Sequence, residues 1–228
     1  LDDNAYDLLA SEARLASFLA IAKGDVSAHH WVHLGRPLTR EQGQPLLLSW
    51  SGTMFEYLMP QLLMREPATT LLGLSARGAI DHQIRYATSR GLPWGISESG
   101  YYLLDGAQNY AYHAFGVPEL SLRSNKGIED WVIAPYATFL ALFWRPKAAF
   151  DNLRHLEKLG MLGRYGFFEA LDYTERRMDV GSSYSIVRSY MAHHHGMSLI
   201  SLGISLSPQH AISRFSRDPR VQACELFL

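Results

Sequence analysis

Two glycine- and aromatic-rich segments each carry a glutamate, and they are the parts of the sequence best suited to chemistry. Glu98 lies in the segment 93–102, and Glu169 lies in the segment 163–173. In both, small residues would let a ligand approach the carboxyl group, and aromatic rings offer flat apolar faces. Apolar walls raise the pKa of a carboxyl group, whereas a better solvated partner stays ionised. We therefore interpret Glu98 and Glu169 as an acid–base pair, with Asp172 and Glu56 as further candidates.

Cleavage of a glycosidic bond is one reaction that needs two carboxyl groups. One protonates the leaving oxygen, and the other attacks the anomeric carbon or activates an acceptor. Aromatic rings beside them can stack on the C–H faces of sugars. The alternative is structural, in that these acids cap helices or pair with Arg77, Arg85 or Arg164. Sequence spacing does not decide between the two interpretations.

Other kinds of site find less support in the sequence. On a helix, the three consecutive side chains of 193–195, all histidines, point in three directions, whereas two metal ligands on one face need i, i+4 spacing. His29 and His33 have that spacing, but Gly24 and other poor helix formers nearby make a continuous helix doubtful, and no third ligand is close. The segment 95–99 fails the G-x-S-x-G pattern, and no phosphate or dinucleotide loop is present. We expect no metal and no cofactor.

Composition narrows the class of partner. The chain has 228 residues, 47% of them hydrophobic, and a formal charge of -1 from scattered charges, which excludes disorder and disfavours a nucleic acid or an anionic membrane. The single cysteine, Cys224, predicts no internal disulfide and is interpreted as a small buried residue. No apolar stretch approaches the roughly twenty residues of a membrane span. The chain starts at Leu1 without an initiator methionine, so we expect a piece of a larger protein.

Helical periodicity dominates the elements that would position these residues. Apolar residues recur every three or four places, with glycine stops and proline starts. The expected helices are a first one capped by Asn4 and stopped by Gly24, one over 51–62 that Pro60 kinks or divides, and further ones over 76–91, 135–142, 146–160 and 184–204 and from Pro208 onwards. No segment shows the period-two alternation of a strand. The segments 24–49, 91–130 and 160–183 between them are unusually long, which is typical of functional loops.

Blocks of sequence spread along the chain resemble the glycoamylase-like region of cyclic β-1,2-glucan synthases. The similarity lies in segments 6–15, 22–26, 49–60, 93–99, 134–137, 163–174 and 189–197. They follow one another in order over nearly the whole chain. One departure is His195, where the family motif has glutamine in His-His-Gln-Gly.

The resemblance implies an (α/α)6 toroid, a ring of helical hairpins around a sugar-binding cleft, and transglycosylation that closes linear β-1,2-glucan into rings. It matches Glu98 and Glu169 to the catalytic acids. We expect substrate contacts from rings, further acids and histidines around them, namely Trp50, Glu56, Trp94, Tyr101, Tyr136, Tyr165, Asp172, Tyr173, His193 and His194. The resemblance also implies partner domains in a glucan synthase anchored in the bacterial inner membrane, with this region facing the cytoplasm.

The sequence therefore predicts an all-α fold, with residues 1–228 as a single domain that forms an incomplete toroid. Twelve helices with their loops need on the order of 300 residues or more, and the periodicity gives about seven. An incomplete ring exposes apolar helix faces, so we expect association. Two other functions stay open beside cyclisation: an endo-acting β-1,2-glucan hydrolase, and a non-catalytic module that holds glucan for neighbouring domains. A purely structural helical spacer fits the aromatic-rich loops less well.

Overall fold

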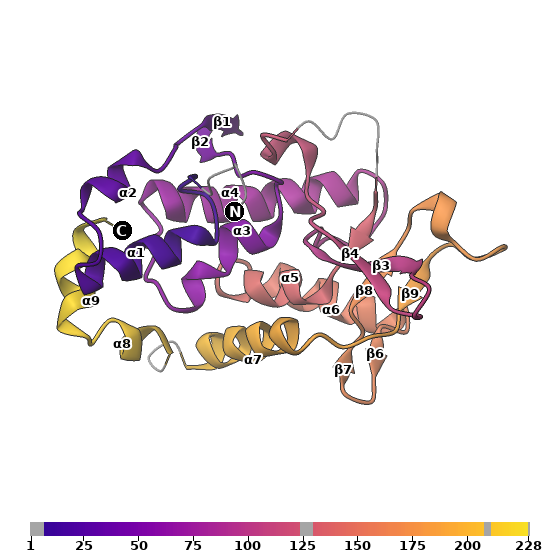
Figure 1. The fold of residues 1–228 in the computed structure, drawn as a ribbon. Helices are drawn as coiled ribbons and strands as arrows, with labels where there is room; N and C mark the ends of the chain where they lie inside the picture. The colour runs from indigo at the N-terminus through magenta and orange to yellow at the C-terminus, as the bar shows by residue number, and fades with distance from the viewer. Residues whose placement is uncertain (1–6, 124–129, 208–210, 228) are drawn as a thin grey trace.

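The computed structural model describes residues 7–123, 130–207 and 211–227. Its helices are α1 (Ala13–Lys23), α2 (His29–His33), α3 (Met54–Leu58), α4 (Leu71–Thr88), α5 (Pro135–Leu140), α6 (Pro146–Lys158), α7 (Ala192–Leu206), α8 (Ala211–Phe215) and α9 (Pro219–Cys224). Its strands are β1 (Leu38–Glu41), β2 (Gln44–Leu47), β3 (Ser99–Leu104), β4 (Tyr110–His113), β5 (Val132–Ile133), β6 (Leu162–Gly163), β7 (Gly166–Phe167), β8 (Ala170–Asp172) and β9 (Ser185–Val187). Helices fill most of the molecule, and the strands from β3 onwards gather at one end (Figure 1). None of the described helices is long and apolar enough to cross a membrane.

Proline and glycine positioned several helix ends as predicted. Pro60 divides the second helix into α3 and a short 3-10 turn over Pro60–Leu62. Pro135 and Pro146 each occupy the first turn of a helix, where the missing N–H costs nothing. Gly24 ends α1 in the left-handed conformation with φ of 81°. These parts of the prediction are confirmed.

Two helix starts were predicted too early. The first helix begins at Ala13, and Leu8 instead forms a parallel bridge with Gly35; Asn4 lies outside the described residues. The predicted helix over 184–204 begins only at Ala192, because Ser185–Val187 forms a strand. Apolar spacing alone does not distinguish these short strand-like segments from a helical turn. Pro208 also lies outside the described residues, and α8 follows it.

The expectation of a chain without strands was wrong. The long segments between helices fold into antiparallel hairpins β1–β2, β3–β4 and β6–β7 and into a three-stranded sheet in the order β5–β8–β9. These strands have two to six residues, too few for alternation to stand out in sequence. The fold is mostly helical, with small sheets that carry the aromatic-rich segments.

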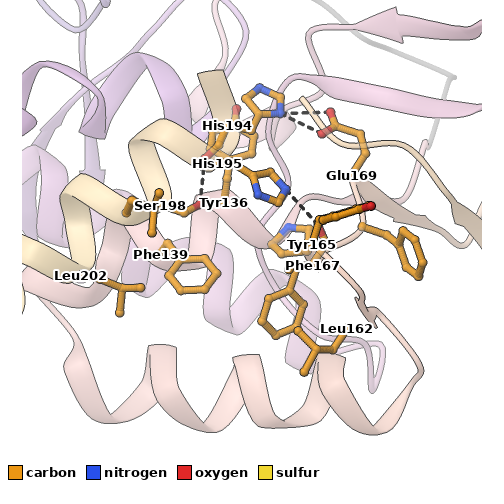
Figure 2. Close-up of a pocket in the computed structure, with 14 residues that line it drawn as sticks. Tyr136, Phe139, Leu162, Tyr165, Phe167, Glu169, His194, His195, Ser198 and Leu202 are labelled. Atoms are coloured by element: carbon orange, nitrogen blue, oxygen red, sulfur yellow. Dashed lines mark hydrogen bonds and ion pairs between the residues drawn. The ribbon is translucent and has the colours of Figure 1, made fainter. Parts of the chain in front are cut away.

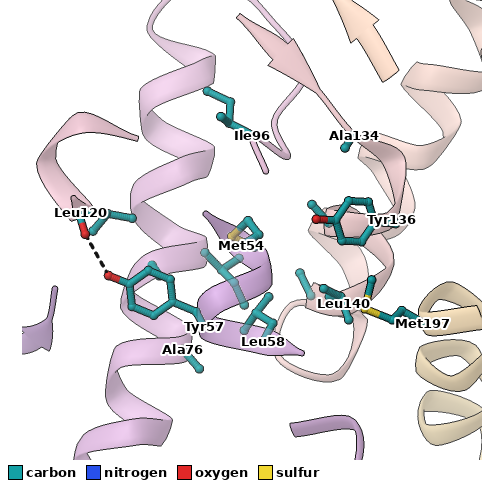
Figure 3. Close-up of a cluster of buried hydrophobic side chains, with 14 of the residues drawn as sticks. Met54, Tyr57, Leu58, Ala76, Ile96, Leu120, Ala134, Tyr136, Leu140 and Met197 are labelled. Atoms are coloured by element: carbon teal, nitrogen blue, oxygen red, sulfur yellow. Dashed lines mark hydrogen bonds between the residues drawn. The ribbon is translucent and has the colours of Figure 1, made fainter. Parts of the chain in front are cut away.

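The core lies between α3, α4, α5 and α7. Met54, Leu58 and Leu140 are fully buried there (Figure 3), and Ile80 of α4 is fully buried as well. Tyr57 lies in the same cluster, and its hydroxyl has two carbonyl acceptors, the oxygen of Leu47 at 2.7 Å and that of Leu120 at 3.2 Å. These contacts satisfy the only polar side-chain atom of a buried ring and connect α3 to β2 and to the 3-10 turn Pro118–Leu120. Cys224 is also buried, as predicted.

Candidate active site

Glu169 lies at the start of the central strand of the three-stranded sheet. Its backbone N–H donates to the carbonyl oxygens of Val187 at 3.2 Å and Ser189 at 3.0 Å, which fixes it just before β8. Its side chain is buried, and the carboxylate accepts the N–H of Gly100 at 3.0 Å. A Cβ at Gly100 would come within 3.3 Å of Glu169 Cγ, so the glycine permits this close approach.

His194 is the second partner of Glu169. It lies in the first turn of α7, is buried, and its Nδ1 is 3.0 Å from the Glu169 carboxylate (Figure 2). The imidazole stacks on Tyr136, with ring centroids 3.8 Å apart and planes 11° from parallel. Tyr136 lies in the first turn of α5. The imidazole is thus held at its Nδ1 edge by a carboxylate and on one face by an aromatic ring.

The three-stranded sheet explains why these side chains meet. Strand β5 leads directly into α5, β9 leads into α7, and β8 between them follows Glu169. Because the helices start from the two outer strands, their first turns lie on either side of the central strand. Residues far apart in the sequence, Tyr136, Glu169 and His194, are therefore brought together by one small sheet.

Glu98 enters the same site from the β3–β4 hairpin. It precedes β3, and Tyr112 of β4 donates its hydroxyl to Glu98 Oε1 at 3.0 Å. The same hydroxyl oxygen lies 3.4 Å from His194 Nε2. The Tyr136 hydroxyl donates to the backbone oxygen of Glu98 at 3.0 Å and pairs with Ser97 Oγ at 2.8 Å. Glu98 and Glu169 are therefore linked through one hydroxyl and one imidazole.

The two carboxyl groups have different surroundings. Glu98 is half-buried, and desolvation raises its pKa, although the hydrogen bond from Tyr112 opposes the shift. Burial and the neighbouring Glu98 carboxylate hold the pKa of Tyr112 far above its usual range, and burial does the same for Tyr136. Both tyrosines are thus neutral and able to donate. Partial desolvation, together with the neighbouring His194, lowers the pKa of His193 beside them.

A cavity of about 340 Å³ opens beside the Glu169–His194 pair (Figure 2). It lies between α5, α7 and the β6–β7 hairpin, and its walls are mainly apolar. The lining includes Tyr136, Phe139, Tyr165, Phe167, Glu169, His194, His195, Leu199 and Leu202. His195 Nε2 bonds to the carbonyl oxygen of Phe167 at 3.1 Å and so ties the hairpin to α7. The predicted residues Tyr136, Tyr165, Glu169 and His194 share this cavity.

The two further acids of the prediction are occupied by backbone and side-chain partners. Glu56 closes a capping box at the start of α3, where its carboxylate accepts Ser49 Oγ at 2.9 Å and the Thr53 N–H at 3.0 Å. Asp172 is fully buried and pairs with Arg177 at 2.7 Å. For these two carboxylates, the structural alternative describes the contacts better than a direct sugar contact does.

The remaining predicted residues lie apart from the carboxylate pair or at its edge. Trp94 is buried, and its backbone pairs with Asn152. The Arg177 guanidinium lies over the ring of Tyr101, 4.8 Å from the ring centroid, and Tyr101 lines a second hollow.

Three other predicted residues pack on neighbouring side chains or segments. Tyr173 packs on Tyr184 with ring centroids 5.6 Å apart. Trp50 is half-buried in the segment that pairs with 121–123, and His193 is exposed beside His194.

Tyr112 is the site residue that the sequence analysis missed. It lies on β4, a strand that was not predicted. Tyr110 and Tyr112 alternate after the turn at Asp105–Gly106, and this short alternation was the available signal.

Within the described part of the chain, no three histidine, cysteine, aspartate or glutamate side chains gather as a metal site would require. The segment around His29 and His33 does form the short helix α2, contrary to expectation. His33 Nδ1 bonds to the His29 carbonyl oxygen at 2.7 Å.

The mostly helical fold, in which Glu169 lines a mainly apolar cavity and Glu98 is linked to it through Tyr112 and His194, is shared with glucoamylase-like proteins of known structure. A glucoamylase-like protein from Bacteroides caccae has a crystal structure similar to this chain, with a TM-score of 0.68 and 19% identity, over 96% of this chain and 54% of that chain. The endo-β-1,2-glucanase from Chitinophaga pinensis, solved with sophorotriose and glucose, gives a TM-score of 0.59 and 18% identity, over 85% of this chain and 46% of that one. These likenesses concern the fold.

The chain belongs to the Glycoamylase family, whose model matches residues 4–204. It is 44% identical over all 228 residues to the cyclic β-(1,2)-glucan synthase NdvB of Rhizobium meliloti (strain 1021). The chain spans 8% of the length of that relative. The resemblance inferred from the sequence blocks is thereby confirmed.

Proposed function

We propose that this chain acts on β-1,2-glucan and transfers glycosyl groups, cyclising linear glucan by a two-carboxylate mechanism. The observation that carries the proposal is the link between Glu98 and Glu169 through Tyr112 and His194. A pair of carboxyl groups in one site is what glycosidic bond cleavage requires. The pair was singled out from the sequence, and its members come from separate parts of the fold, Glu98 just before β3 and Glu169 just before β8.

The names of the similar proteins support the proposal that the substrate is a glucan with β-1,2 linkages. The chain is 44% identical to a region of a cyclic β-(1,2)-glucan synthase, and it shares the fold of β-1,2-glucanases from Chitinophaga pinensis, Parabacteroides distasonis and Talaromyces funiculosus. The near-neutral charge of the chain also suits a neutral polymer.

The two environments suggest a division of labour. Glu98, half-buried with a raised pKa, is suited to give a proton to the leaving oxygen and to take one back from the acceptor hydroxyl. Glu169 faces two N–H groups, from Gly100 and His194, which match the lone pairs of a carboxylate, so it is suited to attack the anomeric carbon. Retention of configuration follows from this double displacement. Tyr136, Tyr165, His193 and His194 are the nearest of the proposed substrate contacts.

An endo-acting hydrolase is the second candidate, favoured by the likeness to endo-β-1,2-glucanases. It uses the same carboxyl groups and differs in the acceptor, which is water in place of a sugar hydroxyl. Product analysis separates the two functions. Cyclic glucan supports transglycosylation, and shortened linear glucan supports hydrolysis.

The test is to incubate linear β-1,2-glucan with this chain alone and with a longer polypeptide that includes the neighbouring sequence. The products are analysed by mass spectrometry and NMR. We expect Glu98→Gln and Glu169→Gln each to lower product formation by at least about a hundredfold, the lower end of typical effects for acid–base residues. Glu157→Gln, on the exposed face of α6, is the matched control. If both site variants keep full product formation while glucan still binds, the non-catalytic glucan-holding function replaces this proposal.

The architecture of the parent protein is part of the proposal. We infer that residues 1–228 form a single domain that is an incomplete portion of an (α/α)6 toroid, because related chains of the same fold are about twice as long as the region that this chain covers. The parent would be a membrane-anchored glucan synthase with this region on the cytoplasmic face. A longer polypeptide that includes the neighbouring sequence should be more active than the chain alone.

A further inference from the structure

The Tyr112 hydroxyl, which connects Glu98 to His194 and so to Glu169, has more hydrogen-bond acceptors than protons. The Tyr112 hydroxyl carries one proton but faces two acceptors, Glu98 Oε1 at 3.0 Å and His194 Nε2 at 3.4 Å. It cannot donate to both with good geometry at once. The direction of the Tyr112 O–H bond must therefore depend on which of the two atoms is the stronger hydrogen-bond acceptor.

The tautomer of His194 is constrained from its other side. Nδ1 faces the Glu169 carboxylate, which offers only acceptors when ionised, so Nδ1 must carry a proton. In the neutral imidazole, Nε2 is then an acceptor and points at Tyr112. The stack on Tyr136 fixes the plane of the ring, so Nε2 keeps this direction.

We propose that Tyr112 and His194 form a reversible hydrogen-bond bridge between Glu98 and Glu169, in which the Tyr112 hydroxyl donates to Glu98 when Glu98 is a carboxylate and to His194 when Glu98 is protonated. The shorter distance to Glu98 corresponds to the first arrangement. In the second, the Glu98 O–H donates to the tyrosine oxygen, and the tyrosine proton turns towards Nε2. No covalent bond changes in the bridge, because the hydroxyl only rotates.

The catalytic role of the bridge rests on the proposed function, because it requires that Glu98 acts as the acid that protonates the leaving oxygen. When Glu98 gives its proton to a leaving oxygen, Tyr112 turns to stabilise the new carboxylate, and His194 loses a bond it had in the ground state. Tyr112 and His194 thus act through the glutamates and are positioning residues in this respect. The other titratable groups near the bridge are His193, Tyr136 and, acting on Glu98 from ahead of α1, Glu12.

The experiment follows the Glu98 carboxyl group by ¹³C NMR through a pH titration without sugar, with Glu98→Gln used to assign the signal. Tyr112→Phe removes the donor to the carboxylate, so the midpoint should rise by about one pH unit. His194→Asn keeps an N–H for Glu169 but removes the competing acceptor, so the midpoint should fall. Tyr110→Phe on the same strand is the control and should leave the midpoint unchanged.

The two variants have opposite expected signs, which makes the result decisive. A higher Glu98 midpoint in His194→Asn would mean that His194 acts as a cation near Glu98, and this would refute the bridge. An unchanged Glu98 midpoint in Tyr112→Phe would refute it as well. If the buried His194→Asn does not fold, the ¹⁵N signal of His194 Nε2 in the wild-type chain replaces it. That signal should move with the midpoint of Glu98 and lose this step in Glu98→Gln; if it does not, the bridge is absent.

Kinetics then distinguish failure of the bridge from failure of the proposed function. With linear β-1,2-glucan, Tyr112→Phe should lower kcat more than it raises KM and should move the alkaline limb of the pH profile to higher pH. If the wild-type protein does not process glucan but the titrations behave as expected, the proposed function is wrong and the bridge stands. If the wild-type protein processes glucan but the titrations do not show the expected shifts, the bridge is wrong and the proposed function stands.

Discussion

At the scale of single residues, the site contrasts two carboxyl groups of the same chemical type. Glu98 is half-buried with one side-chain donor, Tyr112, whereas Glu169 is buried with N–H groups from Gly100 and His194. Environments that differ in this way separate the roles of paired acids in many enzymes. The contrast arises from position, because one glutamate precedes a hairpin strand and the other precedes the middle strand of a sheet.

The raised pKa of Glu98 predicts a stability cost at neutral pH. A carboxyl group whose pKa is higher in the folded than in the unfolded state contributes stability below the unfolded value, and this contribution is lost as the pH rises through the folded value. We therefore expect Glu98→Gln, which keeps an oxygen for Tyr112, to raise Tm at pH 8 more than at pH 4. Calorimetry at the two pH values measures the difference.

The exposed Glu157→Gln is the control for this experiment and should change Tm equally at both pH values. A Glu98→Gln variant that is less stable than the wild type at pH 8 would contradict the desolvation argument.

At the scale of elements, a buried ion pair ties α1 to the segment between the 3-10 turn Pro60–Leu62 and α4. Arg14 and Glu66 are each 1% exposed and lie 2.5 Å apart, and Arg14 also donates to the carbonyl oxygens of Glu56 at 2.9 Å and Tyr57 at 2.8 Å. One oxygen of Glu66, Oε2, has no hydrogen-bond partner. The guanidinium also donates to the carbonyl oxygen of Ser11 at 3.0 Å, so it compensates a buried carboxylate and three backbone oxygens.

Removing this arginine should be costly. Arg14→Met keeps much of the volume but leaves Glu66 as an uncompensated buried charge, so the free energy of unfolding should fall by about 3–5 kcal/mol. Lys147→Met, which breaks an exposed i, i+4 pair with Asp151, should lower it by no more than about 0.5 kcal/mol. Urea denaturation measures both, and equal losses would refute the role of the buried pair.

Glu56 has a structural role at the start of α3. Its carboxylate accepts the Thr53 N–H and the Ser49 hydroxyl, and removing it leaves buried donors unpaired. We expect Glu56→Ala to lower the free energy of unfolding by about 1–3 kcal/mol, and Thr53→Ala by about 1 kcal/mol, as measured by urea denaturation.

The same two variants test the alternative that Glu56 touches the sugar. With linear β-1,2-glucan, the ratio of cyclic to linear products should stay that of the wild type in both variants. A changed ratio in Glu56→Ala alone would return Glu56 to the set of substrate contacts.

At the scale of the whole molecule, apolar side chains stand exposed around the cavity beside α7. Leu199 is 69% exposed, Tyr165 66% and Leu162 49%. Such a face has the composition of a surface that other helices cover. We expect the chain alone to elute in size-exclusion chromatography with light scattering at more than its mass of 25.7 kDa.

The double variant Leu162→Ser/Leu199→Ser should shift this elution towards the monomer. Leu226→Ser, at an exposed leucine away from the cavity, should leave it unchanged. A wild-type chain that is monomeric and fully active on glucan would refute the proposal of an incomplete ring.

From the sequence alone, the mostly helical character and several helix boundaries could be predicted, and Glu98 and Glu169 could be singled out as candidates. Proline and glycine act locally, so Pro60, Pro135 and Gly24 could be interpreted without tertiary information. Apolar periodicity likewise reports burial along one helix and nothing about its neighbours.

Which side chains meet could not be predicted without the three-dimensional fold. Strands of two or three residues leave almost no periodic signal, yet β5, β8 and β9 bring Tyr136, Glu169 and His194 together. Tyr112 reaches Glu98 only because the β3–β4 hairpin closes. Such contacts depend on long-range pairing, whose register is set by packing between segments distant in the chain, so no local pattern of residues contains them.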